Sequence, residues 1–281
     1  MLNIRINPLN LFIIPLLCVF IFSCSMERKL AKNYVKTKDK KSVLVFFPSE
    51  LSKLNLKAYR MPAKDSLQFS DIDSFLMNRS LFLQYINDSV FMAKCKQGMI
   101  KELNNNGINV YEYDQMNEFK KLNDSSYVLN LAQMQLEEYI YQDSAEDFID
   151  GLNYKYYIEL NAINLNSWFE LKRNSLPNEL YPILYSSFLV SDSINGTFLE
   201  SENNDSINFF YVRDTLSLSK IYELAENAGK KYASNLYDYM LNIYVQDHLP
   251  KNLGPKFYFH YDHRERKLKS KYYDRFTEID P

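Results

Sequence analysis

The first half of the chain places two short apolar runs on either side of a longer periodic segment. Residues 43–47 (Val-Leu-Val-Phe-Phe), followed by Pro48, are typical of a strand that is buried on both faces. Residues 108–113 alternate between apolar and polar positions and predict a second strand. The segment between them predicts a helix with apolar positions at Val90, Met92, Cys95, Met99, Ile100 and Leu103. Strand, crossover and strand in this order predict a parallel βαβ unit.

The end of this first helix is marked by Asn104-Asn105-Asn106-Gly107. Asn and Gly accept the left-handed backbone conformation that helix C-termini use, so the sequence predicts a stop here. Residues 126–149 predict a second helix, which Gly151 would end. Its candidate buried positions are Leu129, Ala132, Met134, Leu136, Tyr139, Ile140 and Phe148.

After the second helix the pattern changes to strands and hairpins. Residues 154–165 predict a long strand on which Tyr154, Tyr156, Ile158 and Leu160 share one face. Further strands are expected at residues 168–171, 183–190 and 207–212. Asn195-Gly196 predicts a type I′ turn between strands at 188–193 and 197–200, because this dipeptide accepts positive φ at both central positions.

The last long element is a helix at residues 217–245, where apolar positions recur every three or four residues until Pro250. Residues 257–261 predict an edge strand, and the charged residues 262–281 are expected to form a partly disordered tail. The predicted fold class is therefore α/β (α+β). We expect one domain over residues 42–261, with a mixed sheet, an N-terminal parallel βαβ part, antiparallel hairpins after about residue 165 and long packed helices.

The first 24 residues have the composition of a targeting segment. Arg5 precedes an apolar stretch at residues 9–22, which is too short to span a hydrocarbon core of about 30 Å. Ile21-Phe22-Ser23-Cys24 resembles the lipobox of bacterial lipoproteins, in which the cysteine becomes the lipidated N-terminus. The residues leave two alternatives open, a plain signal peptide cut elsewhere and a buried N-terminal helix with an ordinary core cysteine.

The lipobox resemblance implies how the chain is divided and where it is located. Residues 1–23 would be a cleaved signal peptide, and residues 24–41 would be a polar, lysine-rich tether. Cys24 would carry a diacylglycerol thioether and an N-acyl chain such as palmitate, and several acyl chains give lasting membrane attachment. No Asp follows Cys24, so the resemblance implies the outer membrane, with the domain facing the periplasm.

Composition narrows the classes of function. Lys and Arg number 33 against 35 Asp and Glu, a formal charge of −2, and this leaves no basic surplus for nucleic-acid binding. The chain is 46% hydrophobic, which is typical of a folded protein. Cys95, in an apolar helical pattern, is expected to be a buried small hydrophobe without a redox role.

The order of elements over residues 42–245 resembles the α/β domain of the TolB N-terminal and curli-secretion-type periplasmic lipoproteins. The matching parts are the strand at 43–47 with Pro48, the helix that ends at Gly107, and the strands at 108–113 and 154–165. The resemblance rests on element order and implies a fold, with no chemical motif attached to it.

Patterns that carry chemistry are sparse. His260, Asp262 and His263 lie within four residues, but a zinc site usually needs three converging ligands, so we expect them and His248 in a solvent-exposed polar tail. The pairs Glu137-Glu138 and Glu146-Asp147 are expected on solvated helix faces. Phosphate-loop, dinucleotide, nucleophile-elbow and Cys-x-x-Cys motifs are absent from the sequence. We therefore predict no catalytic residue, no metal ligand and no cofactor.

Aromatic residues are the remaining candidates for a binding site. The chain has 23 Tyr, 19 Phe and 1 Trp, and such rings often anchor interfaces. Tyr157 and Tyr237 fall off the expected buried stripes, and Trp168 lies near Glu170, as a sugar site would require. The leading hypothesis is a non-enzymatic accessory or scaffold in an outer-membrane or periplasmic assembly, with an envelope protein as partner. The alternative is an envelope hydrolase or glycan-binding module, which would need a cleft lined by carboxylates and exposed rings.

Overall fold

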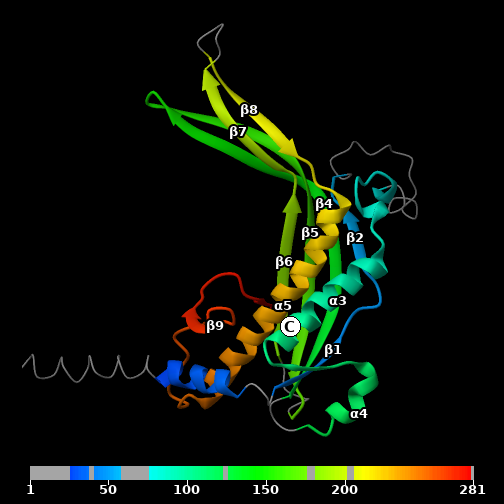
Figure 1. Cartoon of the computed structure of the whole chain (residues 1–281), viewed down its shortest axis with the longest axis vertical. Helices are drawn as coiled ribbons and strands as arrows, with labels where there is room; N and C mark the ends of the chain where they lie inside the picture. Colours follow the sequence, from blue (N-terminus) through cyan, green and yellow to red (C-terminus); the bar gives the residue numbers. More distant parts are fainter. Residues whose placement is uncertain are drawn as a thin grey trace, which may run out of the picture.

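The computed structural model describes residues 26–37, 41–57, 76–122, 126–175, 181–200 and 206–279. Cys24 and the expected signal peptide lie outside these ranges. Figure 1 shows an elongated molecule in which a sheet and two long helices form a body, and two β-hairpins project from one end of it. The helix at residues 26–36 lies at the opposite end of the body.

A seven-stranded mixed sheet is the centre of the body. Its strands are β1 (Ser42–Phe46), β2 (Ser52–Asn55), β3 (Asn109–Tyr111), β4 (Ser126–Ile149), β5 (Leu152–Arg173), β6 (Ile183–Ser191) and β11 (Thr277–Ile279). They lie in the order β11-β6-β5-β4-β1-β3, and β2 pairs with a later part of β4 than β1 does. β1, β2 and β3 make parallel pairs, whereas β5, β6 and β11 are added in antiparallel fashion. The predicted fold class is confirmed.

The N-terminal βαβ unit forms as predicted. β1 and β3 are parallel neighbours, and α3 (Asp88–Asn105) connects them. The side chain of Asn87 caps the first turn of α3 by accepting from the amide of Val90 at 3.1 Å. Gly107 has a φ of 75°, the left-handed conformation that ends the helix. Short helical turns on this side of the body are η3 (Leu83–Tyr85), η4 (Tyr113–Gln115) and α4 (Met116–Phe119).

The helix predicted at residues 126–149 is wrong, because this segment is strand β4. A bulge explains the misleading pattern. The pairing with β5 shifts between Leu131 and Gln133, so the buried residues Leu131 and Met134 are three positions apart. Buried residues alternate at period two before the bulge and again after it, but across the bulge they are three positions apart. The combined spacing therefore resembles that of a helix.

The two long helices lie side by side on one face of the sheet (Figure 1). α5 (Leu218–His248) confirms the predicted C-terminal helix and extends it by three residues. At the crossing with α3 the backbones approach closely, because a Cβ at Gly229 would collide with the carbonyl oxygen of Cys95. A Cβ at Gly98 would likewise collide with the carbonyl oxygen of Glu226. Two facing glycines thus set the distance between the helices.

The lysine-rich segment expected to be a tether, residues 24–41, contains a helix at residues 26–36. Ala31 and Tyr34 are buried on one side of this helix, and the Tyr34 ring lies 5.6 Å from that of Tyr237 in α5. Ala31 and Tyr34 are the buried apolar residues of this helix, and two such positions are too few to give an apolar periodicity in the sequence. Contact with α5, far along the chain, stabilises the helix.

The C-terminal residues, expected to be a partly disordered tail from 262 onward, are ordered over the part that the structure describes. β9 (Phe259–Asp262) and β10 (Lys267–Ser270) form a hairpin, and β11 joins the edge of the main sheet beside β6. Phe276 is buried, with its ring 5.0 Å from that of Phe169. The buried ring of Phe276 anchors the segment to the body. One apolar residue among charged ones hardly changes the composition of the segment, so the sequence does not reveal this anchor.

Candidate functional site

The projecting part of the molecule, which we call the arm, lies beyond the two long helices. It consists of residues 139–161 of β4 and β5 together with the hairpin of β7 (Ser193–Glu200) and β8 (Ile207–Asp214) (Figure 1). β4 and β5 pair continuously out to a turn at Asp150-Gly151. Both turn residues have positive φ, 51° and 84°, as two-residue hairpin turns require.

The β4–β5 ribbon is covered on different faces in the body and in the arm. Side chains alternate along β5, so Phe169 and Tyr156 lie on opposite faces. Phe169 packs against Tyr232 of α5, with ring centroids 4.8 Å apart. Tyr156 packs against Phe209 of β8, with centroids 5.3 Å apart. The helices therefore cover one face in the body, and the β7–β8 hairpin covers the other face in the arm.

Five aromatic rings fill the interface between the two hairpins of the arm. They are Tyr154, Tyr156, Phe198, Phe209 and Tyr211, with centroid separations from 4.8 Å to 6.3 Å. Tyr156 and Tyr211 are each 39% exposed, so water reaches the margin of this layer. The arm therefore has an aromatic core that is one layer thick.

Gly196 makes room for this layer of rings. It pairs with Tyr211, and a Cβ added to it would lie 2.6 Å from Cζ of Phe209 and 2.7 Å from Cβ of Tyr211. The type I′ turn predicted at Asn195-Gly196 is therefore wrong, because both residues lie inside β7. The glycine allows a close approach of side chains and does not turn the chain.

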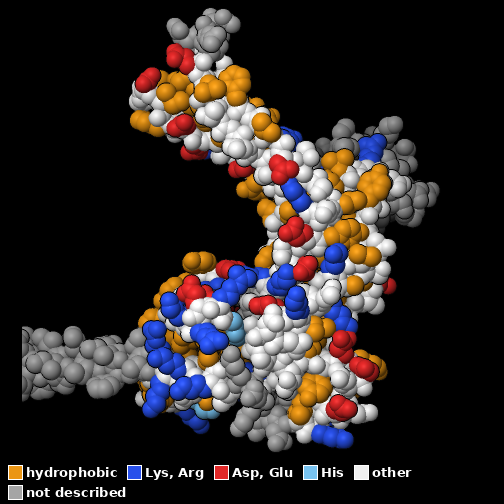
Figure 2. All heavy atoms as spheres, viewed as in Figure 1, with side chains coloured by type: hydrophobic (Ala, Val, Ile, Leu, Met, Phe, Trp, Pro, Cys, Tyr) orange, Lys and Arg blue, Asp and Glu red, His pale blue; other side chains and the backbone are white. Residues whose placement is uncertain are grey.

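Apolar side chains also point outward from the arm. Leu199, Phe210 and Val212 are 50%, 55% and 76% exposed, on the face of the β7–β8 hairpin opposite the ring layer. Phe148 and Tyr157 are exposed on the β4–β5 hairpin. Figure 2 shows hydrophobic side chains gathered along the arm. Exposed apolar groups that are concentrated on one small element indicate an interaction surface.

The arm also presents open strand edges. β2 pairs with β4 only as far as Glu138, and β6 pairs with β5 only as far as Ala162. Beyond these residues neither β4 nor β5 pairs with a further strand within the described ranges, although the carbonyls of Asn161 and Glu159 accept from the amide of Asp192 and from Arg213. β7 and β8 pair only with each other there. Unpaired backbone N–H and C=O groups on such edges can accept an added strand.

A buried carboxylate holds the base of the arm. Asp192, between β6 and β7, accepts hydrogen bonds from the amide of Leu216 at 2.7 Å and from the amide of Asn161 at 3.0 Å. Arg213 lies 3.9 Å away and also donates to the carbonyl of Glu159. Burial acts to raise the pKa of Asp192, but the hydrogen bonds and Arg213 outweigh it and hold the pKa below its ordinary value.

A second buried carboxylate, Glu138, is linked to Asp192 through Lys57 and Asn161. Glu138, expected on a solvated helix face, is fully buried and accepts from the amides of Leu81, Phe82 and Leu83. The Nζ of Lys57 lies 3.0 Å from Glu138 and donates to Asn161 at 2.7 Å. Asn161 also donates to Asp192, so a continuous polar network crosses the sheet where the arm begins.

The arm is acidic. Its β4–β5 part (139–161) together with β7 and β8 contains seven Asp and Glu residues against two Lys and Arg residues, a formal charge of −5. Of the two basic residues, Lys155 pairs with Glu146, and Arg213 pairs with the buried Asp192. The exposed apolar patch is therefore set in a negatively charged surface.

The three aromatic residues predicted as binding candidates have different environments. Tyr157 is 60% exposed on the arm, as predicted. Trp168 is half-buried on the sheet face opposite the helices, with its ring 5.4 Å from that of Tyr185. The prediction for Tyr237 is wrong, because it is fully buried between Tyr34 and Tyr261. The rings of the β7–β8 hairpin were missed, although residues 209–211 (Phe-Phe-Tyr) gave a signal.

The histidines and Cys95 belong to the body. His260, expected in an exposed tail, places its Nδ1 2.7 Å from Oδ2 of the buried Asp238 of α5, and His263 packs edge-on against Tyr237. Burial raises the pKa of Asp238, although His260 partly opposes this. Cys95 is buried, as predicted, and burial raises its pKa to about 12. Within the described ranges no three His, Cys, Asp or Glu side chains are grouped to hold a metal ion.

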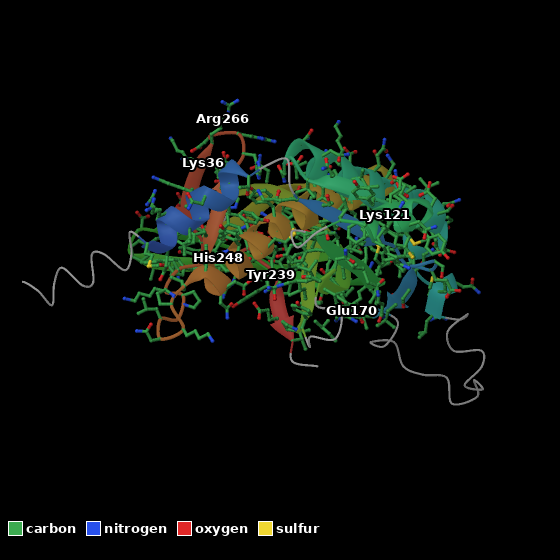
Figure 3. The ribbon with its side chains drawn as sticks, turned by 90° about the horizontal axis from the view of Figure 1, so that it is seen from below. Lys36, Lys121, Glu170, Tyr239, His248 and Arg266 are labelled. Carbon is green, nitrogen blue, oxygen red and sulfur yellow. The ribbon has the colours of Figure 1, made fainter. Side chains whose placement is uncertain are left out.

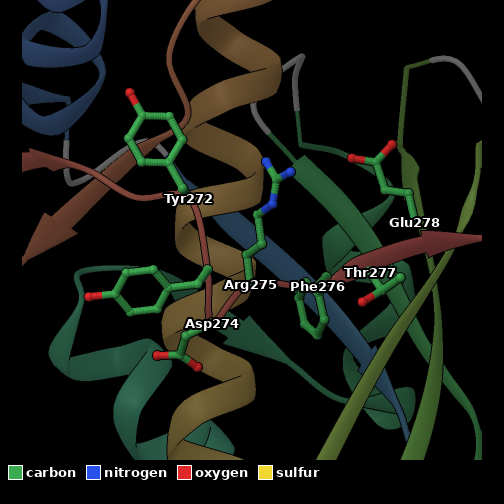
Figure 4. Close-up of a pocket in the computed structure, with 7 residues that line it drawn as sticks. Tyr272, Asp274, Arg275, Phe276, Thr277 and Glu278 are labelled. Atoms are coloured by element: carbon green, nitrogen blue, oxygen red, sulfur yellow. The ribbon is translucent and has the colours of Figure 1, made fainter.

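Two hollows lie on the body. The first, of about 560 Å³, is lined by a single segment, residues 272–278, whose side chains are drawn in Figure 4. Arg275 of this segment lies over the ring of Tyr258 at 4.8 Å. A second hollow of about 310 Å³, between α5 and the β9–β10 hairpin, contains Lys230, Lys231 and Arg264.

No protein-family model and no curated protein sequence matches the chain. None of the described helices is long and apolar enough to cross a membrane.

Proposed function

We propose that this chain is a lipid-anchored lipoprotein of the bacterial outer membrane, facing the periplasm, and that it acts as a non-enzymatic accessory or scaffold. The arm would bind an envelope protein partner. The observation that carries the proposal is the exposed patch of Leu199, Phe210 and Val212 at the end of the molecule opposite residues 26–36. A folding requirement does not account for such a patch, because these side chains point away from the ring layer.

The position of the proposed anchor suits this role. Cys24 precedes the first described residue, Met26, by two positions, a distance of at most about 7 Å of extended chain. The helix at residues 26–36 packs on the body, so this part of the expected tether belongs to the folded protein. α5 has 31 residues and is therefore about 46 Å long. It connects the base of the arm to the anchored end and would hold the arm away from the membrane.

The surface of the arm indicates the kind of partner. An apolar patch within a surface of charge −5 would be complemented by an apolar contact ringed by Lys and Arg. The open edges of the two hairpins offer backbone groups for an added strand. We therefore infer a protein partner with a basic rim, bound by side-chain burial and strand addition.

The anchor is tested by intact-mass and fractionation analysis of the native protein beside a Cys24→Ala variant. A lipid-sized mass increment on a chain that begins at Cys24, together with loss of membrane association in the variant, is expected. A soluble, unlipidated native chain would contradict the anchor and leave the arm to be tested by itself.

The arm is tested by a double variant, Phe210→Ser with Val212→Ser, in an affinity purification from membranes with the tagged chain. We expect the co-purified partner to be lost while the protein stays folded. The matched control is Tyr272→Ser with Tyr273→Ser, which removes two exposed rings from the body and should leave the partner bound. Equal loss in both variants, or loss in neither, would refute a role specific to the arm.

A further inference from the structure

The end of the molecule opposite the arm has a strong positive charge that the net charge of the chain conceals. We define the basic lobe as residues 26–37 and 249–271. It contains eleven Lys and Arg residues against three Asp and Glu residues, a formal charge of +8 in a chain whose total is −2. Figure 2 shows Lys and Arg side chains clustered on this lobe, whereas Asp and Glu predominate on the arm. Charge is thus segregated along the long axis.

One face of the helix at residues 26–36 accounts for much of the exposed positive charge. Glu27, Ala31 and Tyr34 are buried against the body. Lys29, Lys32 and Lys36 are exposed, and their three- and four-residue spacing places them on one face of the helix. Within the described ranges no ion pair neutralises any of these three lysines.

This basic face belongs to a fixed element. The carboxylate of Glu27 accepts from the amide of Lys256 at 3.1 Å, and Arg28 donates to the carbonyl of Leu268 in β10 at 3.3 Å. The Tyr34 ring lies 5.3 Å from that of Tyr244 in α5. The three exposed lysines therefore have a set orientation relative to the rest of the molecule.

The β9–β10 hairpin extends the same surface. Arg264 and Arg266 lie in its turn, and Lys267 has a side chain that is 70% exposed. Figure 3 shows Lys36 and Arg266 close together at one edge of the molecule, while Lys121 lies at another part of it. Asp262 and Glu265 pair with Lys269 on the hairpin, and this leaves the two arginines without an ion pair among the described residues.

We propose that the basic lobe binds the anionic headgroups of a phospholipid surface and thereby directs the arm away from that surface. A lipid surface is favoured over other anionic partners because the chain leads from this lobe to Cys24 within two residues. Basic residues held near an anionic leaflet are attracted to it, and the attraction decreases within a Debye length. The choice of a membrane rests on the proposed anchor, but headgroup binding itself needs no lipid on Cys24.

The test uses the unlipidated chain from residue 24 with Cys24→Ser, which contains every residue that the structure describes. Its binding to sedimented vesicles of phosphatidylcholine alone is compared with its binding to vesicles that also contain phosphatidylglycerol. We expect binding to the anionic vesicles to be more than about tenfold tighter and to weaken as salt is added.

The decisive variant is Lys29→Glu with Lys32→Glu and Lys36→Glu, which should lower affinity for the anionic vesicles more than about tenfold. The matched control replaces three exposed lysines outside the lobe, Lys101, Lys120 and Lys121, with Glu and should bind almost as the parent does. The corresponding Lys→Gln triple variant keeps the test valid if charge reversal disturbs folding, and it should show a smaller loss. Circular dichroism checks that each variant is folded.

Three outcomes would overturn the proposal. Equal binding to both kinds of vesicle would show that charge is not the cause, and equal loss in the control variant would show that the lobe has no special role. Salt-sensitive self-association without vesicles, abolished by the triple Lys→Glu change, would assign the lobe to the acidic arm of a second copy. None of these results bears on lipidation of Cys24, which the mass analysis tests separately.

Discussion

The arm and the body are both built on the β4–β5 ribbon, but they are stabilised in different ways. In the body, α3 and α5 cover the ribbon, and residues such as Leu129, Leu165 and Phe169 are fully buried. In the arm, the β7–β8 hairpin covers the opposite face with a single layer of rings, of which Tyr156 and Tyr211 remain partly exposed. One pair of strands thus supports a closed core at one end and an open surface at the other.

This difference indicates a division of roles. The body has a thick core whose helices are held at glycine contacts, and its exposed rings, such as Tyr113 and Tyr273, are spread over several elements, so it suits a support. A thin ring layer with outward-pointing Leu199, Phe210 and Val212 keeps apolar area available for a partner. The arm should therefore open locally at lower free energy than the body does.

The largest effect is expected when a ring is removed from the body. Phe169→Ala should lower the free energy of unfolding by about 4 kcal/mol, because a fully buried ring leaves a cavity, whereas Phe209→Ala should cost about 1–2 kcal/mol within the arm. In a chain that begins at residue 24 and carries Cys24→Ser, Cys95 is the remaining thiol, and its labelling reports opening of the body. Labelling should accelerate with Phe169→Ala and stay near the parental rate with Phe209→Ala. Equal acceleration would show that the two regions unfold together.

The contact between the helices gives the next largest effect. Gly229→Ala should cost about 3 kcal/mol, because the added methyl meets the backbone of Cys95 and Met99, which cannot move aside. Gly254→Ala is the control, since nothing lies within 4 Å of its added Cβ, and it should change stability by less than about 0.5 kcal/mol. Chemical denaturation measures both. A loss of stability below about 1 kcal/mol in Gly229→Ala would mean that the two helices can move apart at little cost.

The base of the arm should show a specific pH dependence. Because the folded-state pKa of Asp192 is below its ordinary value of about 3.9, its stabilisation is present above that value and is lost as the pH falls through the folded-state pKa. Asp192→Asn should cost about 2 kcal/mol at neutral pH and weaken the decline in stability under acid. Amide hydrogen exchange in β7 and β8 measures where the loss occurs. An unchanged acid dependence would exclude Asp192 as its source.

The smallest effect on stability is expected on the outer face of the arm. Phe210→Ser with Val212→Ser should change the free energy of unfolding by less than about 0.5 kcal/mol, because both side chains already face water. Thermal denaturation measures this. A large loss would show that these residues stabilise the fold and would remove the main argument for a binding surface.

The body could largely be predicted from the sequence, and the arm could not. In α3 and α5 apolar residues recur every three or four positions, and Gly107 and Pro250 mark where the helices stop, so the local pattern is sufficient to predict both helices. β4 was mistaken for a helix because its bulge after Leu131 shifts the alternation and because it is rich in Leu, Met, Gln and Glu, which favour helices in isolation. Pairing with β5 along its whole length overrides that preference.

The candidate site depended on contacts that no local pattern shows. Asp150-Gly151 is a hairpin signal, but a helix predicted at residues 126–149 gives Gly151 the role of a helix stop instead. Gly196 serves ring packing across strands, and Asn195-Gly196 therefore suggested a turn that does not exist. The helix at residues 26–36 and the segment around Phe276 likewise depend on distant residues, Tyr237 and Phe169.

In the proposed function the arm contacts a partner while the body does not. Site-specific photo-crosslinking in cells distinguishes the two regions, with a photoreactive residue placed at Phe210 in one strain and at Tyr272 in another. We expect a discrete adduct from Phe210 that disappears when Leu199→Asp is added, and none from Tyr272. Adducts of equal yield from both positions, or none from Phe210, would contradict the claim that the arm is the binding surface.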